Sequence, residues 1–170
     1  MIQRKNLLNI TLWWSVIGVS IWIGGTVYMM SVIDPQWSQN PPESLRSFLG
    51  QTDFNKYIWN FFGPPFMVLR SLLPVVLALI FGWNSRRHRR YLSITLSITV
   101  ILIIFTLGYI YPINNVLFFK AGGDLSPHAI QTLVKHWIIA DRLRFAVYLV
   151  GYFFLLKAFR LPYTPESTSQ

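Results

Sequence analysis

The sequence predicts an all-α fold: an integral membrane four-helix bundle with both termini on the cytoplasmic side. Of its 170 residues, 53% are hydrophobic and 12% are charged, whereas about 25% of the residues of a typical soluble domain are charged. Four apolar runs approach the roughly 20 residues that a helix needs to cross a bilayer. These runs are residues 7–33, 66–83, 92–111 and 138–161. They leave no room for a separate soluble domain, so we expect residues 1–170 to form a single membrane domain.

Basic residues at the ends of these runs predict the orientation. The net charge of +9 would suit a nucleic-acid-binding protein, but the charges lie at alternate ends of the spans. By the positive-inside rule, the flanks rich in Lys and Arg are cytoplasmic. We therefore expect the lipid bilayer as partner, no nucleic acid and, from charge bias and compactness alone, a bacterial plasma membrane. The basic residues of these flanks are Arg4, Lys5, Arg86, Arg87, Arg89, Arg90, Lys157 and Arg160.

The chain contains no cysteine, which excludes disulfides, thiol redox chemistry and iron–sulfur clusters. We expect His88, in the basic loop of residues 84–91, to be solvated. His128 and His136 are eight residues apart, about two helical turns. Together with Asp141 they could still converge in three dimensions, but no metal-ligand spacing is present. We expect no metal site and no cofactor.

The first apolar run is longer than the hydrophobic region of a signal peptide, so we expect a retained span. Its small and polar residues share one face, which favours close packing against another helix; Gly24 and Gly25 would alternatively make room for a flat ligand. We expect the helix to end between Ile33 and Pro35, because proline disfavours helical geometry in the residue before it. The residues of this face are Thr11, Ser15, Gly18, Trp22 and Gly25.

Residues 36–60 are more polar and predict an outer interfacial segment between the first two spans, with a short helix at 43–50. The second span carries Arg70, which costs at least a few kcal/mol in lipid unless it reaches the interface or finds a partner. That partner would be Asp34 or Asp141. Pro74 should kink this span or break it locally. Aromatic residues typical of an interfacial belt accompany the segment: Trp37, Tyr57, Trp59, Phe61 and Phe62.

We expect Pro112 to stop the third span. The two residues Asn114 and Asn115 then either cap the broken helix end or belong to a buried polar network, because a buried amide needs partners. Residues 120–124 predict a flexible turn. Ser126 is a predicted N-cap with Pro127 at the first helical position, and the helix that they open would run into the fourth span.

The fourth span places an indole, a carboxylate, a guanidinium and a phenol on one helical face. Asp141 and Arg144, three residues apart, can pair. Such a pair is either a structural staple or the anchor of a polar pocket. The face consists of Trp137, Asp141, Arg144, Tyr148 and Gly151.

Three short motifs resemble the anthrone-oxygenase-like family of small four-helix membrane proteins. They are GGTVYMMSVIDP after the first span, PINN after the third, and HW followed by DRLR in the fourth. Pro112, Asn114 and Asn115 match the proline and asparagine motif of the family, while Trp137 and Arg144 match its tryptophan and arginine motif. Asp141 stands where the family often has Asn or His.

The resemblance implies a cofactor-free oxygenation of a polyphenolic anthrone to an anthraquinone, on a hydrophobic aromatic or quinone-like ligand. A base and donors that hold the phenolate would suffice. His136 or Asp141 would be the catalytic base. The substrate-binding residues would be Asn114, Asn115, Trp137, Arg142, Arg144, Tyr148 and Arg70.

The same polar residues also suit a protein without enzymatic activity. In that alternative the chain binds lipid or assists a partner complex, and Asn115, Trp137, Asp141 and Arg144 form a structural staple. A channel is disfavoured, because no span carries a polar stripe from end to end.

Overall fold

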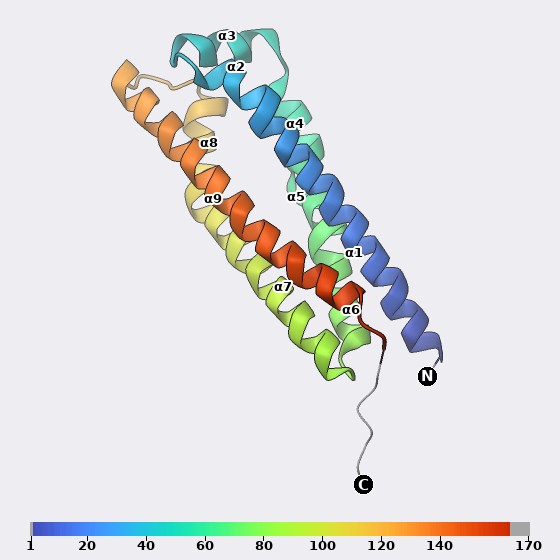
Figure 1. The fold of residues 1–170 in the computed structure, drawn as a ribbon. Coiled ribbons are helices and arrows are strands. Elements are labelled where there is room, and N and C mark those ends of the chain that lie inside the picture. The colour runs from blue at the N-terminus through green and yellow to red at the C-terminus, as the bar shows by residue number, and fades with distance from the viewer. Residues whose placement is uncertain (1, 164–170) are drawn as a thin grey trace. The chain divides into compact units, whose positions relative to one another are not determined.

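The computed structural model describes residues 2–163, apart from the side chains at positions 2, 55, 57–59 and 64. Within these residues every regular element is a helix and there is no strand (Figure 1), so the all-α prediction is confirmed. Three helical segments are long and apolar enough to cross a membrane. They are Gln3–Ser38, Asn60–Gly82 and Arg86–Phe119.

Several long helices are built from α-helical pieces joined by π-helical turns. The α-helices are α1 (Ile2–Tyr28), α2 (Asp34–Ser38), α3 (Glu43–Gln51), α4 (Phe54–Phe62), α5 (Pro64–Met67), α6 (Leu73–Gly82), α7 (Arg86–Phe105), α8 (Tyr111–Asn114) and α9 (Pro127–Phe159). The π turns are η1 (Met29–Ile33), η2 (Val68–Leu72), η3 (Thr106–Ile110) and η4 (Asn115–Phe119).

Three of these π turns end two residues before a proline inside a helix, namely Pro35, Pro74 and Pro112. In each case the residue before the proline donates its backbone N–H to the carbonyl five residues earlier. Proline has no N–H, and its ring clashes with the carbonyl four residues before it in an α-helix. The wider π turn relieves this clash. The helix therefore continues past each proline.

Two predicted helix ends are consequently wrong. The first helix does not end between residues 33 and 35, since α2 continues it to Ser38, and Pro112 does not stop the third span, which continues to Phe119. The predicted interruption at Pro74 takes the form of η2. The helix that contains Pro112 ends instead at the turn after residue 119, where Ala121, Gly122 and Gly123 all have positive φ.

The predicted start of the last helix is confirmed. The Ser126 hydroxyl accepts the backbone N–H of Ala129 at 3.3 Å, and Pro127 is the first residue of α9. The helix runs without interruption through the predicted fourth span, 138–161, almost to its end. It is not among the three apolar segments, because Asp141, Arg142 and Arg144 lie in its middle.

The chain forms two compact units. Unit 1 contains residues 2–22, 64–101 and 147–163 of the described part, and unit 2 contains residues 23–63 and 102–146. The helices α1, α7 and α9 contribute residues to both units.

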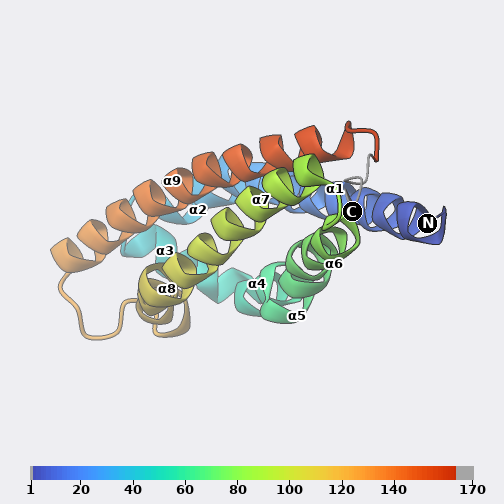
Figure 2. The same cartoon turned by 90° about the horizontal axis from the view of Figure 1, so that it is seen from below.

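In unit 1, α6 and the first part of α7 form an antiparallel hairpin (Figures 1 and 2). His88 lies at its tight connection and is 1% exposed, so the expectation of a solvated histidine is wrong. The Ser85 hydroxyl is 2.9 Å from His88 Nδ1, and this bond, together with apolar neighbours, accounts for the burial. A Cβ added to Gly82 would lie 3.2 Å from that of His88, which shows how closely the hairpin packs.

The predicted packing face of the first helix is confirmed in unit 1. Thr11, Ser15, Gly18 and Trp22 are all buried. Gly18 lies against the backbone of η2, where a Cβ would be 2.0 Å from the Arg70 carbonyl oxygen. In an α-helix this carbonyl would accept the backbone N–H of residue 74, but Pro74 has no N–H. A glycine is therefore required where the backbone of α1 approaches this oxygen.

Unit 2 has an apolar core rich in aromatic rings. Its short helices α2 and α3 lie next to each other (Figure 1), and the Ser44 hydroxyl donates to the Trp37 carbonyl at 2.7 Å. The predicted short helix at 43–50 is confirmed, since α3 spans Glu43–Gln51. The buried core residues are Trp37, Leu45, Phe48, Phe54, Ile110, Ile113, Leu117, Phe118, Ile130, Val134, Trp137 and Ala140.

Candidate functional site

Three aromatic side chains from different helices meet at the centre of unit 2. Trp37 in α2, Phe118 in η4 and Trp137 in α9 contact one another edge to face, with ring centroids 5.1 to 5.7 Å apart. Trp37 is fully buried. Edge-to-face pairs add to the stability that burial provides, so this triad gives unit 2 a rigid apolar centre.

The triad is connected to polar side chains through the Trp137 indole, whose N–H donates to the Asn114 amide oxygen. Asn114 lies at the end of α8, and the neighbouring Asn115 is exposed. Because the helix continues through both residues, neither caps a broken end. Only Asn114 enters a buried polar network.

A second group of bonded polar side chains lies on the buried face of α9. Arg144 pairs with Asp141 and also donates to the Thr106 hydroxyl at 3.2 Å. Asp141 is 4% exposed, whereas Arg142 is exposed. The predicted pairing of Asp141 with Arg144 is thus confirmed, and Thr106 of η3 joins it.

Asp34 brings a second buried carboxylate to this region. It is the first residue of α2 and is only 3% exposed. Its Oδ1 atom and the Trp37 indole nitrogen make no hydrogen bond of ordinary geometry among the described residues, although the Trp37 side chain interacts with this carboxyl. The charged groups that act on it are Asp141, Arg142 and Arg144. We name Asp34, Trp37, Thr106, Asn114, Phe118, Trp137, Asp141 and Arg144 the polar–aromatic cluster.

Other predicted site residues lie elsewhere. The side chain of His136 is exposed. In unit 1, the Tyr148 hydroxyl donates to the Ser71 hydroxyl at 3.2 Å and its ring packs on Trp22, while the Arg70 guanidinium lies over the Phe66 ring. No group of three or more His, Cys, Asp or Glu side chains suited to a metal ion occurs in the part of the chain that the structure describes.

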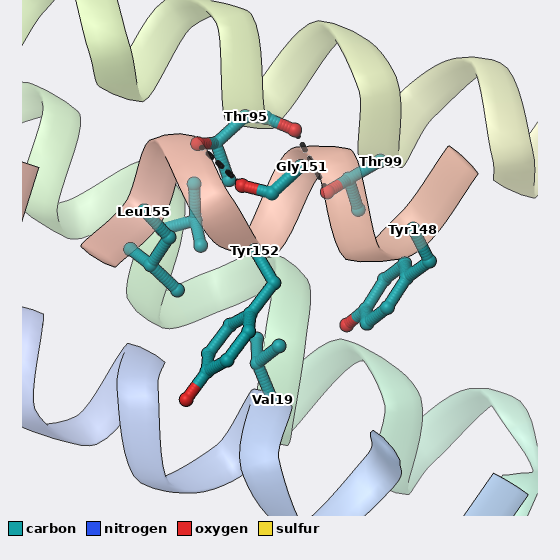
Figure 3. Close-up of a pocket in the computed structure, with 8 residues that line it drawn as sticks. Val19, Thr95, Thr99, Tyr148, Gly151, Tyr152 and Leu155 are labelled. Carbon is teal, nitrogen blue, oxygen red and sulfur yellow. Dashed lines mark hydrogen bonds between the residues drawn. The ribbon is translucent and has the colours of Figure 1, made fainter. Parts of the chain in front are cut away.

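Tyr148 lines a small cavity in unit 1 (Figure 3). The cavity has a volume of about 10 Å³, which is enough for one water but far below the roughly 300 Å³ of a small-molecule site. The Thr95 hydroxyl donates to the Gly151 carbonyl beside it. The cavity is lined by Val19, Val75, Thr95, Thr99, Tyr148, Gly151, Tyr152 and Leu155.

The sequence predicts that Asn114, Trp137, Asp141 and Arg144 share one site, but it does not place Asp34, Trp37, Thr106 or Phe118 there. A signal for Asp34 was present, because a carboxylate directly follows an apolar run of the first helix. Its burial depends on α2 continuing past Pro35, which the sequence did not indicate. Thr106 gave no signal, since hydroxyls in apolar helices usually bond to their own helix.

No protein-family model matches this chain, and neither the curated proteins nor the solved structures contain a match.

Proposed function

We propose that this chain is an integral membrane protein of four helices, with both termini cytoplasmic, that acts on a hydrophobic aromatic or quinone-like molecule at the polar–aromatic cluster. The fourth membrane helix would be α9, whose 33 residues extend about 50 Å. Its Asp141 and Trp137 are on the buried face, and a membrane helix tolerates ionisable side chains when they face the protein interior. The basic flanks support the orientation.

The observation that carries the proposal is the Asp34 carboxylate. A buried carboxylate without a full set of partners is costly, and ionisable groups kept inside membrane proteins mark functional sites. Asp141 is held by Arg144, and His136 is exposed. Asp34 is therefore the group of this cluster best suited to accept a proton, and the aromatic rings beside it suit a flat substrate.

The chemistry would be the cofactor-free oxygenation that the resemblance implies. Asp34 removes a proton from the methylene carbon of an anthrone, and the electron pair moves onto the ketone oxygen. The positive charge of Arg144 stabilises this oxyanion. Dioxygen adds at the carbanion carbon, the peroxide takes the proton back, and the hydroperoxide loses water to give the quinone. One dioxygen is consumed and one water is released per substrate.

Oxygen uptake by the purified protein in detergent, with a model anthrone, tests this proposal. We compare the wild type with Asp34→Asn, and with Asp124→Asn as a matched change at an exposed carboxylate of the same unit. Removing a general base costs about 100-fold or more in rate, so uptake should collapse in Asp34→Asn and persist in Asp124→Asn. Uptake no faster than the spontaneous reaction, or equal in the two variants, would overturn the proposal.

The second candidate, a structural staple in a lipid-binding or assembly protein, is favoured by the bonds within the cluster. Trp137 bonds to Asn114, and Arg144 bonds to Asp141 and to Thr106. In this case Asn114→Ala lowers the thermal stability, because the buried indole N–H loses its acceptor, and no variant consumes oxygen. Oxygen uptake therefore separates the two candidates, whereas the loss of thermal stability in Asn114→Ala is expected under both.

A further inference from the structure

Unit 1 carries an unbalanced positive charge. Its described residues include nine Lys and Arg residues and no Asp or Glu. Eight of the nine lie at the start of α1, at the α6–α7 connection and at the end of α9. Figure 1 shows these three places at the same end of unit 1. Nothing within the described part of unit 1 can neutralise this end.

Two of these eight residues are used by the fold. Arg4 donates from Nε to the Phe81 carbonyl at 3.0 Å and from a terminal nitrogen to the Ile80 carbonyl at 2.9 Å. Arg89 donates to the Trp83 carbonyl at 3.1 Å. Both therefore satisfy carbonyls at the C-terminal end of α6, where positive charge is favourable.

The other six side chains are exposed. We name this set the basic face. It consists of Lys5, Arg86, Arg87, Arg90, Lys157 and Arg160.

The backbone that carries the basic face is held in place by buried contacts. His88 bonds to Ser85, and the centroid of its ring lies 6.2 Å from that of Tyr163, so the start of α7 contacts the segment that follows α9. Arg4 fixes the start of α1 to the end of α6. The three parts of the basic face are therefore held together by the fold rather than by mobile loops.

Exposed aromatic rings lie at the same end. Trp13 packs edge to face on Phe159, and Trp83, which lies under the Arg89 guanidinium, is 52% exposed. Tryptophan is enriched at the level of the lipid headgroups in membrane proteins, so these rings favour a position of the basic face near lipid phosphates.

We propose that the basic face binds anionic phospholipid, with phosphate oxygens held by Arg86, Arg87 and Arg90 in the first turns of α7. A guanidinium binds a phosphate through two parallel hydrogen bonds, and the N-terminal end of α7 adds its positive dipole. Clusters of Lys and Arg at the cytoplasmic end of membrane helices attract anionic lipid at about fivefold in affinity per residue.

Lipid titration of the purified full chain in neutral detergent tests this inference. The fluorescence of the native tryptophans reports binding of short-chain phosphatidylglycerol, and phosphatidylcholine serves as the uncharged comparison. We expect phosphatidylglycerol to bind at least tenfold more tightly, with an affinity that falls as salt is added. Equal affinity for the two lipids would overturn the proposal.

Variants locate the site. The triple variant Arg86→Gln, Arg87→Gln, Arg90→Gln should lose at least tenfold in affinity for phosphatidylglycerol. The matched control removes three exposed positive charges from unit 2 as Arg46→Gln, Lys56→Gln, Lys135→Gln, and should stay within twofold of the wild type. Equal losses in the two triple variants would mean that net charge alone attracts the lipid and would refute the site.

A further variant, Arg86→Lys, Arg87→Lys, Arg90→Lys, keeps the charge but loses the paired hydrogen bonds. It should bind phosphatidylglycerol more weakly than the wild type and more tightly than the glutamine variant. Binding equal to that of the glutamine variant would show that the positive charge contributes nothing. Binding equal to that of the wild type would show that the paired hydrogen bonds of arginine contribute nothing.

Discussion

The contact between Gly18 and η2 allows a quantitative prediction. In Gly18→Ala, the added methyl carbon would lie 2.0 Å from the Arg70 carbonyl oxygen and 2.9 Å from its carbonyl carbon. Both partners are backbone, so neither can rotate away, and one helix must move. Inserting a methyl group into a packed core costs about 1–3 kcal/mol, and a clash with fixed backbone belongs at the upper end. We expect a loss of about 3 kcal/mol, or roughly 6–12 °C in Tm for a chain of this length.

Gly24→Ala is the matched control, because nothing lies within 4 Å of the added carbon. Alanine is the better helix former by up to about 1 kcal/mol, so this variant should be unchanged or slightly more stable. Since the chain has no cysteine, thermal unfolding in detergent is followed by circular dichroism rather than by a thiol-reactive dye. A Gly18→Ala variant as stable as the wild type would refute the close approach of α1 to the freed carbonyl.

Three further predictions concern hydrogen bonds and a second glycine, and each is measured by the same thermal unfolding. Tyr148→Phe and Ser71→Ala should each cost about 1 kcal/mol, and the double variant should cost less than their sum because both remove one bond; full additivity would contradict the contact. Thr106→Val should cost about 1–3 kcal/mol, since it removes an acceptor of the Arg144 guanidinium, whereas an unchanged Tm would show that the hydroxyl is not needed. Gly25→Ala should destabilise less than the substitution at position 18, because the added carbon meets the edge of a phenylalanine ring, which can move.

The packing faces could be predicted from the sequence because they depend only on helical periodicity. Thr11, Ser15 and Gly18 on one helix and Trp137 and Asp141 on another are buried as the spacing indicated. The pair of Asp141 with Arg144 followed from the same geometry, since residues three apart on a helix are neighbours.

The effect of the prolines was not predictable in the same way. The helix ends predicted at Pro35 and Pro112 follow from the effect of proline in an α-helix, where it removes a hydrogen bond and clashes with a carbonyl. Such predictions do not consider that a π turn can form before the proline. This turn becomes favourable only when neighbouring side chains support the continued helix. The burial of His88 likewise depends on contacts with Ser85 and Tyr163, one of which lies more than 70 residues away in sequence.

The π turns also determine the rotational phase of the helices that contain them. A π turn accommodates one residue more than an α-helical turn, and one residue corresponds to a rotation of about 100° around the helix axis. The residues after η1 are therefore rotated relative to a straight continuation of α1, and this rotation places Asp34 and Trp37 on the side that faces the core of unit 2. A chain that lacked one residue of η1 and carried Ala at position 35 would form a regular α-helix. Asp34 and Trp37 would then face away from the core of unit 2. The extra residue in η1 therefore determines that Asp34 and Trp37 belong to the polar–aromatic cluster.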